Sequence, residues 1–202
     1  MQITRVYPYR LGKPETILTG AMVSRDGEIF GVLVNGRPVL VSFDGQIIPL
    51  PSEVYTTVST AAALSPDGAC LALGTEQSLK MITLSTKEIR TADSEPIYQL
   101  AWNSRSDLLV AGHQYPKLCF WNVDFECVAA VRLGTPRGQR CWAVTYSADD
   151  QRLFTASTFP RPNWLCSTTV NGEVSRFKLP QERYVHGLFP WQNGVPVSYT
   201  HL

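Results

Sequence analysis

One short phrase recurs four times along this chain of 202 residues, and its spacing constrains the fold more than any other feature. The serines that open the four copies are separated by 41, 39 and 43 residues. A unit of about 40 residues repeated head to tail is typical of a propeller blade or another repeat architecture. The copies read Ser24-Arg25-Asp26-Gly27, Ser65-Pro66-Asp67-Gly68, Ser104-Arg105-Ser106-Asp107 and Ser147-Ala148-Asp149-Asp150.

Apolar residues keep fixed distances from each of these serines. Three residues before the serine stands a smaller one: Ala21, Ala62, Ala101 and Val144. Six residues after it stands a larger one: Phe30, Leu71, Val110 and Leu153. The period-two alternation before each serine predicts a strand, and the Asp, Gly and Ser residues after it predict a turn.

Three more strands are expected in each unit. The second covers 29–34, 70–75, 108–113 and 152–158; the third covers 38–43, 79–84, 118–123 and 164–170. The fourth covers 46–50, 88–92, 127–133 and 173–179, and Asp44-Gly45 and Asn171-Gly172 predict type I′ hairpins before it. Four antiparallel strands per unit, without a helical period, indicate a propeller blade.

We therefore expect an all-β chain, a β-propeller with four full four-stranded blades and part of a fifth in an incomplete ring. The expected blades are 17–56, 57–95, 96–137 and 138–182, with the start of a fifth at 183–196 and a possible ring-closing strand at 3–10. A complete four-bladed ring is the alternative. Residues 197–202, Val-Ser-Tyr-Thr-His-Leu, resemble the translation of a sequencing-library adapter, so we expect a non-native tail and a protein that continues.

Composition excludes several classes of protein. The formal charge of +1 provides no long-range attraction to nucleic acid or an anionic membrane. Gly, Pro and charged residues interrupt every apolar run before it reaches the length of a membrane span. The five cysteines lack a C-x-x-C pair and stand among apolar strand residues, which predicts reduced, buried thiols in a cytoplasmic protein: Cys70, Cys119, Cys127, Cys141 and Cys166.

No catalytic, metal or cofactor motif is present. His113 and His186 have no Cys, Asp or Glu at metal-ligand spacing, and there is no G-x-S-x-G, P-loop or G-x-G-x-x-G. We expect Asp26, Asp67 and Asp149 to hydrogen-bond their own turns rather than to form a carboxylate site. The expectation is a protein that is not an enzyme and holds no cofactor.

Ser65-Pro66-Asp67-Gly68, residues 71–75 (Leu-Ala-Leu-Gly-Thr) and 118–122 (Leu-Cys-Phe-Trp-Asn) resemble WD40-repeat proteins. The resemblance covers about residues 17–194, and Trp121-Asn122 approximates the Trp-Asp pair that ends the third strand in that family. It implies a β-propeller that acts as an interaction scaffold. Ser-x-Asp-Gly turns are also found in TolB-like and prolyl-oligopeptidase-like propellers, which remain alternatives.

In a propeller, loops between the second and third strands share one face with the connections between blades, and loops carry most binding functions. Aromatic and basic residues, which dominate interface hot spots, are frequent in these loops. We expect them to bind a protein or peptide rather than nucleic acid: Tyr55, His113, Tyr115, Lys117, Arg137, Arg140, Phe159, Arg161, Trp164, Arg183 and Tyr184. Trp102, Trp121 and Trp142 lie in strands and are expected to pack between blades.

Two enzyme hypotheses remain as alternatives. In one, the propeller belongs to a larger enzyme such as a serine hydrolase, whose nucleophile would follow residue 196. In the other, a catalytic site lies in the central channel, where the first strands would need clustered His or carboxylate side chains. Those strands carry Ala21, Ala62, Ala101 and Val144 instead, which counts against a channel site.

Overall fold

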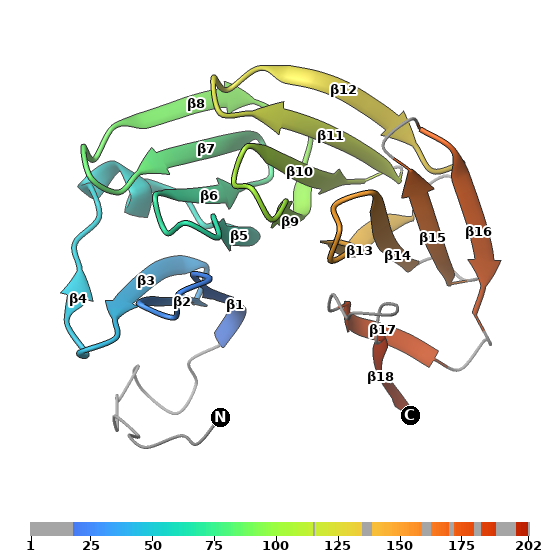
Figure 1. Ribbon diagram of the computed structural model, residues 1–202, viewed down its shortest axis with the longest axis horizontal. Coiled ribbons are helices and arrows are strands. Elements are labelled where there is room, and N and C mark those ends of the chain that lie inside the picture. The colour runs from blue at the N-terminus through green and yellow to red at the C-terminus, as the bar shows by residue number, and fades with distance from the viewer. Residues whose placement is uncertain are drawn as a thin grey trace.

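The computed structural model describes residues 18–114, 116–134, 139–158, 163–169, 172–179, 183–188 and 197–201. Their strands form four sheets of four antiparallel strands, each in sequence order, and a fifth sheet of two strands. The sheets follow one another along an open arc, with the first strand of each nearest the centre and the fourth outermost (Figure 1). The fold is an open β-propeller, which confirms the expected all-β class.

Four blades are complete, and each is named here by its strands. Blade 1 contains β1 (Leu18–Val23), β2 (Ile29–Val34), β3 (Arg37–Ser42) and β4 (Ile47–Ile48). Blade 2 contains β5 (Ala61–Leu64), β6 (Cys70–Gly74), β7 (Ser78–Thr83) and β8 (Ile89–Asp93). Blade 3 contains β9 (Ile97–Trp102), β10 (Leu108–His113), β11 (Lys117–Asn122) and β12 (Cys127–Arg132). Blade 4 contains β13 (Arg140–Tyr146), β14 (Arg152–Thr158), β15 (Trp164–Thr169) and β16 (Val174–Lys178).

Two further elements complete the described chain. A 3-10 helix, η1 (Ser52–Thr56), connects blade 1 to blade 2. The fifth sheet pairs β17 (Arg183–Leu188) with β18 (Val197–His201) in antiparallel register. β18 lies in the segment that we expect to be an adapter-derived tail. Its pairing with β17 does not test that expectation, which stays a prediction. The possible ring-closing strand at 3–10 lies outside the described residues.

The repeated turns between first and second strands use one hydrogen-bonded design. In blade 2 the Ser65 hydroxyl donates to the Asp67 carboxylate at 2.5 Å and accepts from the Cys70 backbone nitrogen at 2.9 Å. Blades 1 and 4 repeat both contacts. The Ser24 hydroxyl donates to Asp26 and accepts from the Ile29 nitrogen, and the Ser147 hydroxyl donates to Asp149 and accepts from the Arg152 nitrogen. The prediction that these aspartates bond their own turns is therefore confirmed.

Blade 3 requires a correction of one residue. Asn103, not Ser104, occupies the serine position, because its amide oxygen accepts from the backbone nitrogen of Leu108 at 3.1 Å. The backbone nitrogen of Asn103 donates to the Leu108 carbonyl, as Ser65 does to Cys70. Leu100 and Leu109, rather than Ala101 and Val110, are therefore the counterparts of Ala62 and Leu71. Since side chains alternate along a strand, a shift of one residue assigns them to the wrong face.

The predicted type I′ turn at Asp44-Gly45 is also wrong. Only Gly45 has a positive φ there, 88°, and its nitrogen bonds to the carbonyl of Ser42, whereas a type I′ turn needs positive φ at both central residues. The pair that meets this condition is Asn35-Gly36, with φ of 51° and 72°, between β2 and β3. Asn171 of the second predicted turn lies outside the described residues.

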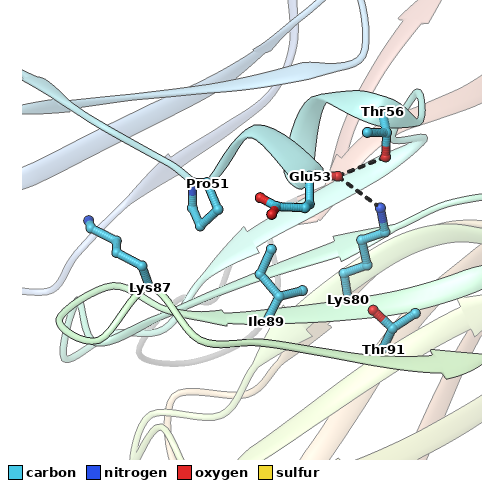
Figure 2. Close-up of a pocket in the computed structure, with 7 residues that line it drawn as sticks. All are labelled: Pro51, Glu53, Thr56, Lys80, Lys87, Ile89 and Thr91. Carbon is cyan, nitrogen blue, oxygen red and sulfur yellow. Dashed lines mark hydrogen bonds between the residues drawn. The ribbon is translucent and has the colours of Figure 1, made fainter.

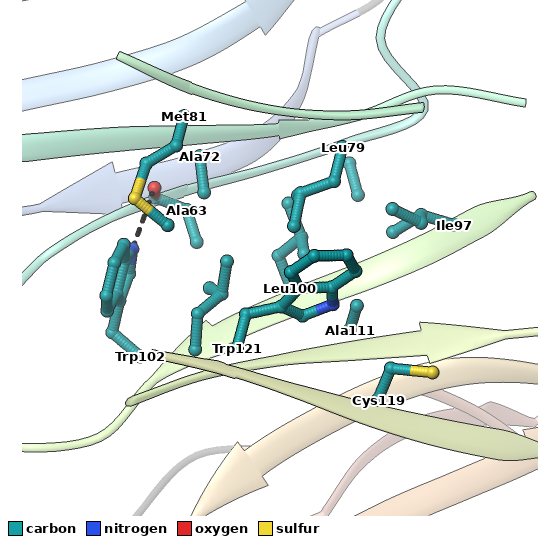
Figure 3. Close-up of a cluster of buried hydrophobic side chains, with 12 residues drawn as sticks. Ala63, Ala72, Leu79, Met81, Ile97, Leu100, Trp102, Ala111, Cys119 and Trp121 are labelled. Carbon is teal, nitrogen blue, oxygen red and sulfur yellow. Dashed lines mark hydrogen bonds between the residues drawn. The ribbon is translucent and has the colours of Figure 1, made fainter. Parts of the chain in front are cut away.

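Apolar cores lie between neighbouring blades. The core between blades 2 and 3 includes Leu79, Met81, Trp102 and Trp121 (Figure 3). Trp102 and Trp121 are each 8% exposed, which confirms their packing between blades, but Trp142 is 44% exposed and does not fit that prediction. Cys141 and Cys166 are buried as expected, whereas Cys127 is exposed; all five cysteines are free.

Candidate partner-binding face

Strand ends of blades 3 and 4 bring several predicted residues to one edge of the propeller. β9 begins at Ile97, β10 ends at His113, β11 begins at Lys117 and β13 begins at Arg140. Because neighbouring strands are antiparallel, these starts and ends meet on the face that carries the connections between blades. An isolated bridge between Gln114 and Arg140 joins blade 3 directly to blade 4 there.

A patch of polar and aromatic residues occupies this edge, and we name it the Tyr98–Arg140 patch. The Arg140 guanidinium lies over the Tyr98 ring, 5.0 Å from its centroid. The Lys117 ammonium pairs with the Glu95 carboxylate at 3.2 Å. A guanidinium stacked on an aromatic ring keeps its N–H edge available for a carboxylate, and the ring restricts its motion. The patch consists of Glu95, Tyr98, Gln114, Lys117 and Arg140.

Electrostatics within the patch follow from these contacts. Burial is the largest single influence and opposes the charge of Lys117, but the hydrogen bond that the ammonium donates to Glu95 and the nearby acidic groups together raise its pKa. Lys117 therefore stays charged at neutral pH. Within the described part of the chain, the Arg140 guanidinium has no ion-pair partner, although the side chain is exposed. The patch thus contains two cations: Lys117, which is paired with the Glu95 carboxylate, and Arg140, which is positioned by the Tyr98 ring.

His113 lies beneath the patch rather than on it. Its side chain is 1% exposed, and Nδ1 lies 3.2 Å from the Glu95 carbonyl oxygen. Burial lowers the pKa of the imidazole, so the ring is neutral at pH 7. With Nδ1–H donating to the carbonyl, Nε2 is left as a buried acceptor that has no hydrogen-bond partner among the described residues. His113 supports the backbone of Glu95 and makes no surface contact in this conformation.

The other predicted residues have varied positions. Tyr55 is exposed on η1. Trp164 begins β15 but is partly buried against the core between blades 3 and 4, so the ring serves packing. Arg183 and Tyr184 lie in β17, where they pair with His201 and Thr200. Four predicted residues lie outside the described part of the chain: Tyr115, Arg137, Phe159 and Arg161. The structure therefore places Lys117 and Arg140 along the same edge of the propeller, where Lys117 pairs with Glu95 and Arg140 contacts Tyr98 and Gln114.

A hollow of about 490 Å³ lies between η1 and the outer strands of blade 2 (Figure 2). Lys80 of β7 connects blade 2 to η1, because its Nζ donates to the Glu53 carbonyl at 3.3 Å and to Thr57 Oγ1 at 3.0 Å. The Glu53 carboxylate points into the hollow above Ile89, with Lys87 on the far side (Figure 2). The full lining is Pro51, Glu53, Thr56, Lys80, Lys87, Ile89 and Thr91.

The opposite face is formed by the turns between first and second strands, and it is tied together across blades. The Arg25 nitrogen donates to the Pro66 carbonyl at 2.7 Å, and the Asp67 nitrogen donates to the Ser106 hydroxyl at 3.1 Å. A second hollow of about 350 Å³ lies among these turns, lined by Arg25, Asp26, Pro66, Asp67, Ser104, Arg105 and Ser106. Arg25 also donates to the Ser104 carbonyl, so hydrogen bonds among these turns join blades 1, 2 and 3.

Metal and membrane sites have no support in the described residues. No group of three or more His, Cys, Asp or Glu in that part of the chain is arranged to hold a metal ion. Within the same residues, no helix combines the length and hydropathy needed to cross a bilayer.

Comparison with known proteins supports the fold. No family model matches the chain, and no curated protein matches it. Among solved structures, the chain is similar to Kuenenia stuttgartiensis hydrazine synthase, with a TM-score of 0.77 at 12% sequence identity. The match covers 96% of this chain and 59% of that one, so the chain spans well under two thirds of its length. Since 1167 solved chains match, the likeness identifies a common architecture and not an activity.

Proposed function

We propose that this chain is a non-catalytic β-propeller module that binds an acidic peptide segment of a partner protein through the Tyr98–Arg140 patch. One observation carries the proposal: an exposed guanidinium without an ion-pair partner among the described residues is held over an aromatic ring at the junction of two blades. Holding the side chain before binding lowers the entropy lost on docking. Arg and Tyr are also the residues that most often dominate binding energy.

The mechanism is recognition by fixed side chains on a rigid support. Arg140 would bind a carboxylate of the peptide through its N–H edge, while Tyr98 offers apolar area beside it. Lys117 is partly neutralised by Glu95, which would favour a peptide with few negative charges over a polyanion such as nucleic acid. The WD40 resemblance in blades 2 and 3 is consistent with such a scaffold role, as is the lack of catalytic motifs in the sequence.

A reducing compartment forms part of the proposal. Cys141 and Cys166 both lie in the core between blades 3 and 4, yet both thiols are free. Burial raises the pKa of Cys141 to about 12 and that of Cys166 to about 11, which makes both thiols unreactive. These features support a cytoplasmic protein. The hypothesis of a larger enzyme stays a prediction that no described residue favours.

Selection of peptides from a random phage-displayed library on the full chain tests the proposal. Enriched peptides should carry Asp or Glu beside an apolar residue, and their affinity is measured by fluorescence anisotropy. We expect Arg140→Ala and Tyr98→Ala each to weaken binding about tenfold or more, as hot-spot truncations do. The matched control is Arg152→Ala, since Arg152 is an exposed arginine on the opposite face. Peptides that bind Arg140→Ala as tightly as the unchanged chain would exclude this patch.

A further inference from the structure

The hollow between η1 and the outer strands of blade 2 follows from the short outer strand of blade 1. β4 contains only Ile47–Ile48, whereas β8 of blade 2 contains Ile89–Asp93. After β4 the chain turns into η1, which the Lys80 ammonium fixes through the Glu53 carbonyl and Thr57 Oγ1. β4 is therefore too short to cover all of β8, and the hollow of about 490 Å³ lies beside it (Figure 2).

An apolar floor and charged walls surround this hollow. Ile89 lies beneath it and packs against the core between blades 1 and 2, and Pro51 lies at the start of η1 across from it (Figure 2). Glu53 and Lys87 stand on two sides of the space, with the Glu53 carboxylate projecting into it (Figure 2). The volume and the mixture of apolar and polar lining are typical of a site for a small molecule.

The two charges do not neutralise each other. Within the part of the chain that the structure describes, neither the Glu53 carboxylate nor the Lys87 ammonium has an ion-pair partner. The Glu53 carboxylate accepts a hydrogen bond from the hydroxyl of the preceding Ser52 at 3.2 Å. Both charges are therefore available to a ligand, one on each side of the apolar floor.

Lys87 occupies a backbone position that favours glycine. It ends the turn between β7 and β8 with a φ of 63°, and its nitrogen donates to the Thr83 carbonyl. The residues that end the equivalent turns of blades 1 and 4 are Gly45 and Gly172, with φ of 88° and 84°. A side chain in this left-handed region costs conformational energy that glycine avoids.

Blade 3 shows how such a cost is offset. Phe125 ends its turn with a φ of 67°, and its ring packs on Trp121 with 5.4 Å between the centroids. The Lys87 side chain is half-buried, but its ammonium has no hydrogen-bond or ion-pair partner among the described residues. A strained residue that no internal contact explains indicates a role at the site that it lines.

We propose that this hollow binds a small zwitterion of about the size of a dipeptide. The carboxylate of the ligand pairs with Lys87, its ammonium pairs with Glu53, and its apolar side chain covers Ile89. A ligand with a single charge would leave one of the two protein charges unpaired. The placement of Lys87 and Glu53 on two sides of the hollow favours a dipeptide over a free amino acid, whose charged groups share one carbon atom.

Isothermal titration calorimetry of the full chain with the dipeptide alanyl-leucine tests this proposal. We expect a dissociation constant of about 1 mM, as is typical of a ligand of this size. N-acetyl-alanyl-leucine lacks the ammonium and alanyl-leucine amide lacks the carboxylate, so each should bind about fivefold more weakly or worse. Equal affinities of the free and blocked dipeptides would overturn the proposal, as would no binding up to about 20 mM.

Substitutions at the two charged residues locate the ligand. Lys87→Gly removes the ammonium and relieves the strained φ, so it should weaken binding about fivefold or more without lowering the melting temperature. Glu53→Gln should weaken binding by a similar factor. The matched control is Lys178→Gln, because Lys178 is an exposed lysine of β16 outside the hollow, and it should leave the affinity unchanged. Unchanged affinity in Lys87→Gly would overturn the proposal.

The hollow and the Tyr98–Arg140 patch share no residue, so the two proposals fail separately. Binding of alanyl-leucine that is lost in Arg140→Ala would place the dipeptide at the patch and overturn the assignment to the hollow. Binding that is lost in Lys87→Gly and retained in Arg140→Ala would support the hollow, whatever the acidic-peptide selection yields.

Discussion

The Asp150 carboxylate in the turn of blade 4 accepts two hydrogen bonds from Ser104 in the turn of blade 3. One comes from the backbone nitrogen at 2.9 Å and the other from the hydroxyl at 2.6 Å. Asp150 also adopts a φ of 59°, in the left-handed region where Gly27 and Gly68 stand in blades 1 and 2. Asp150 therefore adopts a strained backbone conformation at a position where its side chain connects blade 4 to blade 3.

Asp150→Ala should lower the free energy of unfolding by about 1 kcal/mol or slightly more, because two hydrogen bonds to a charged group are lost while the strained φ remains. Asp150→Gly should cost less, since it relieves the strain. Chemical denaturation of the full chain measures both. Asp124→Ala, at an exposed turn residue of blade 3, serves as the control and should change stability little. Equal losses in Asp150→Ala and Asp124→Ala would show that the link between the turns contributes nothing.

The two buried tryptophans of blade 3 should differ in their response to the same substitution. The Trp102 indole nitrogen donates to the Ala63 carbonyl at 3.3 Å, whereas the Trp121 indole nitrogen has no hydrogen-bond partner within the part of the chain that the structure describes (Figure 3). Trp102→Phe should destabilise by about 1 kcal/mol more than Trp121→Phe, because only the first removes a hydrogen bond and leaves an acceptor behind. Thermal unfolding measures the difference. A larger loss for Trp121→Phe would contradict this interpretation.

Gly74 permits close approach of blades 2 and 3. A Cβ at this position would lie 2.5 Å from Cγ2 and 2.8 Å from Cβ of Ile97. Gly74→Ala should therefore destabilise by about 1–3 kcal/mol through overpacking. Ile97→Ala alone should also destabilise, because it leaves a cavity, but the double variant should lose less than the two single losses together. Additive losses, measured by denaturation, would show that the two residues do not compete for space.

His113 should make stability depend on pH near neutrality. Its pKa is lowered from the ordinary 6.5, chiefly by burial, with Lys117 adding to the effect. As pH falls below 6.5, the unfolded chain binds a proton more readily than the folded chain, so the folded state loses stability. The loss levels off below the lowered pKa of the folded state. His113 faces Glu95 and Lys117, and hydrogen bonding by the Glu95 backbone only partly opposes the shift.

His113→Gln should flatten the pH dependence of the unfolding free energy between about pH 7 and 5, since glutamine does not titrate. The comparison with the unchanged chain isolates His113 from the other histidines. An identical slope in both proteins would show that His113 is protonated equally in the folded and unfolded states.

The turn design and strand pattern were accessible from the sequence because both depend on local geometry. Serine and aspartate two residues apart satisfy a turn through their own side chains, as Ser65 and Asp67 do. Alternation along β10 and β14 likewise follows from the pleat, and both strands have the predicted bounds. Asn103 was missed because asparagine replaces serine in the same hydrogen bond, and residue identity alone does not reveal that equivalence.

The candidate site was only partly predictable. Lys117 and Arg140 followed from residue type and loop position, but Tyr98 lies in a strand and is separated from Arg140 by 42 positions in the sequence. His113 was expected on the surface, yet the packing of blade 2 on blade 3 buries it. No local pattern could give either result, because each depends on contacts between blades.

The sequence by itself determined the blade as a unit: its strands, its turns and its period, all set by residues close together in the chain. Only the tertiary structure decided which apolar side chains a neighbouring blade covers and which cations remain exposed. Those outcomes depend on stacking one sheet on the next: Leu71 of blade 2 is 0% exposed, whereas Phe30, its counterpart in blade 1, is 44% exposed. Whether an apolar side chain is buried therefore depends on the blade that packs against it as well as on its own chemistry.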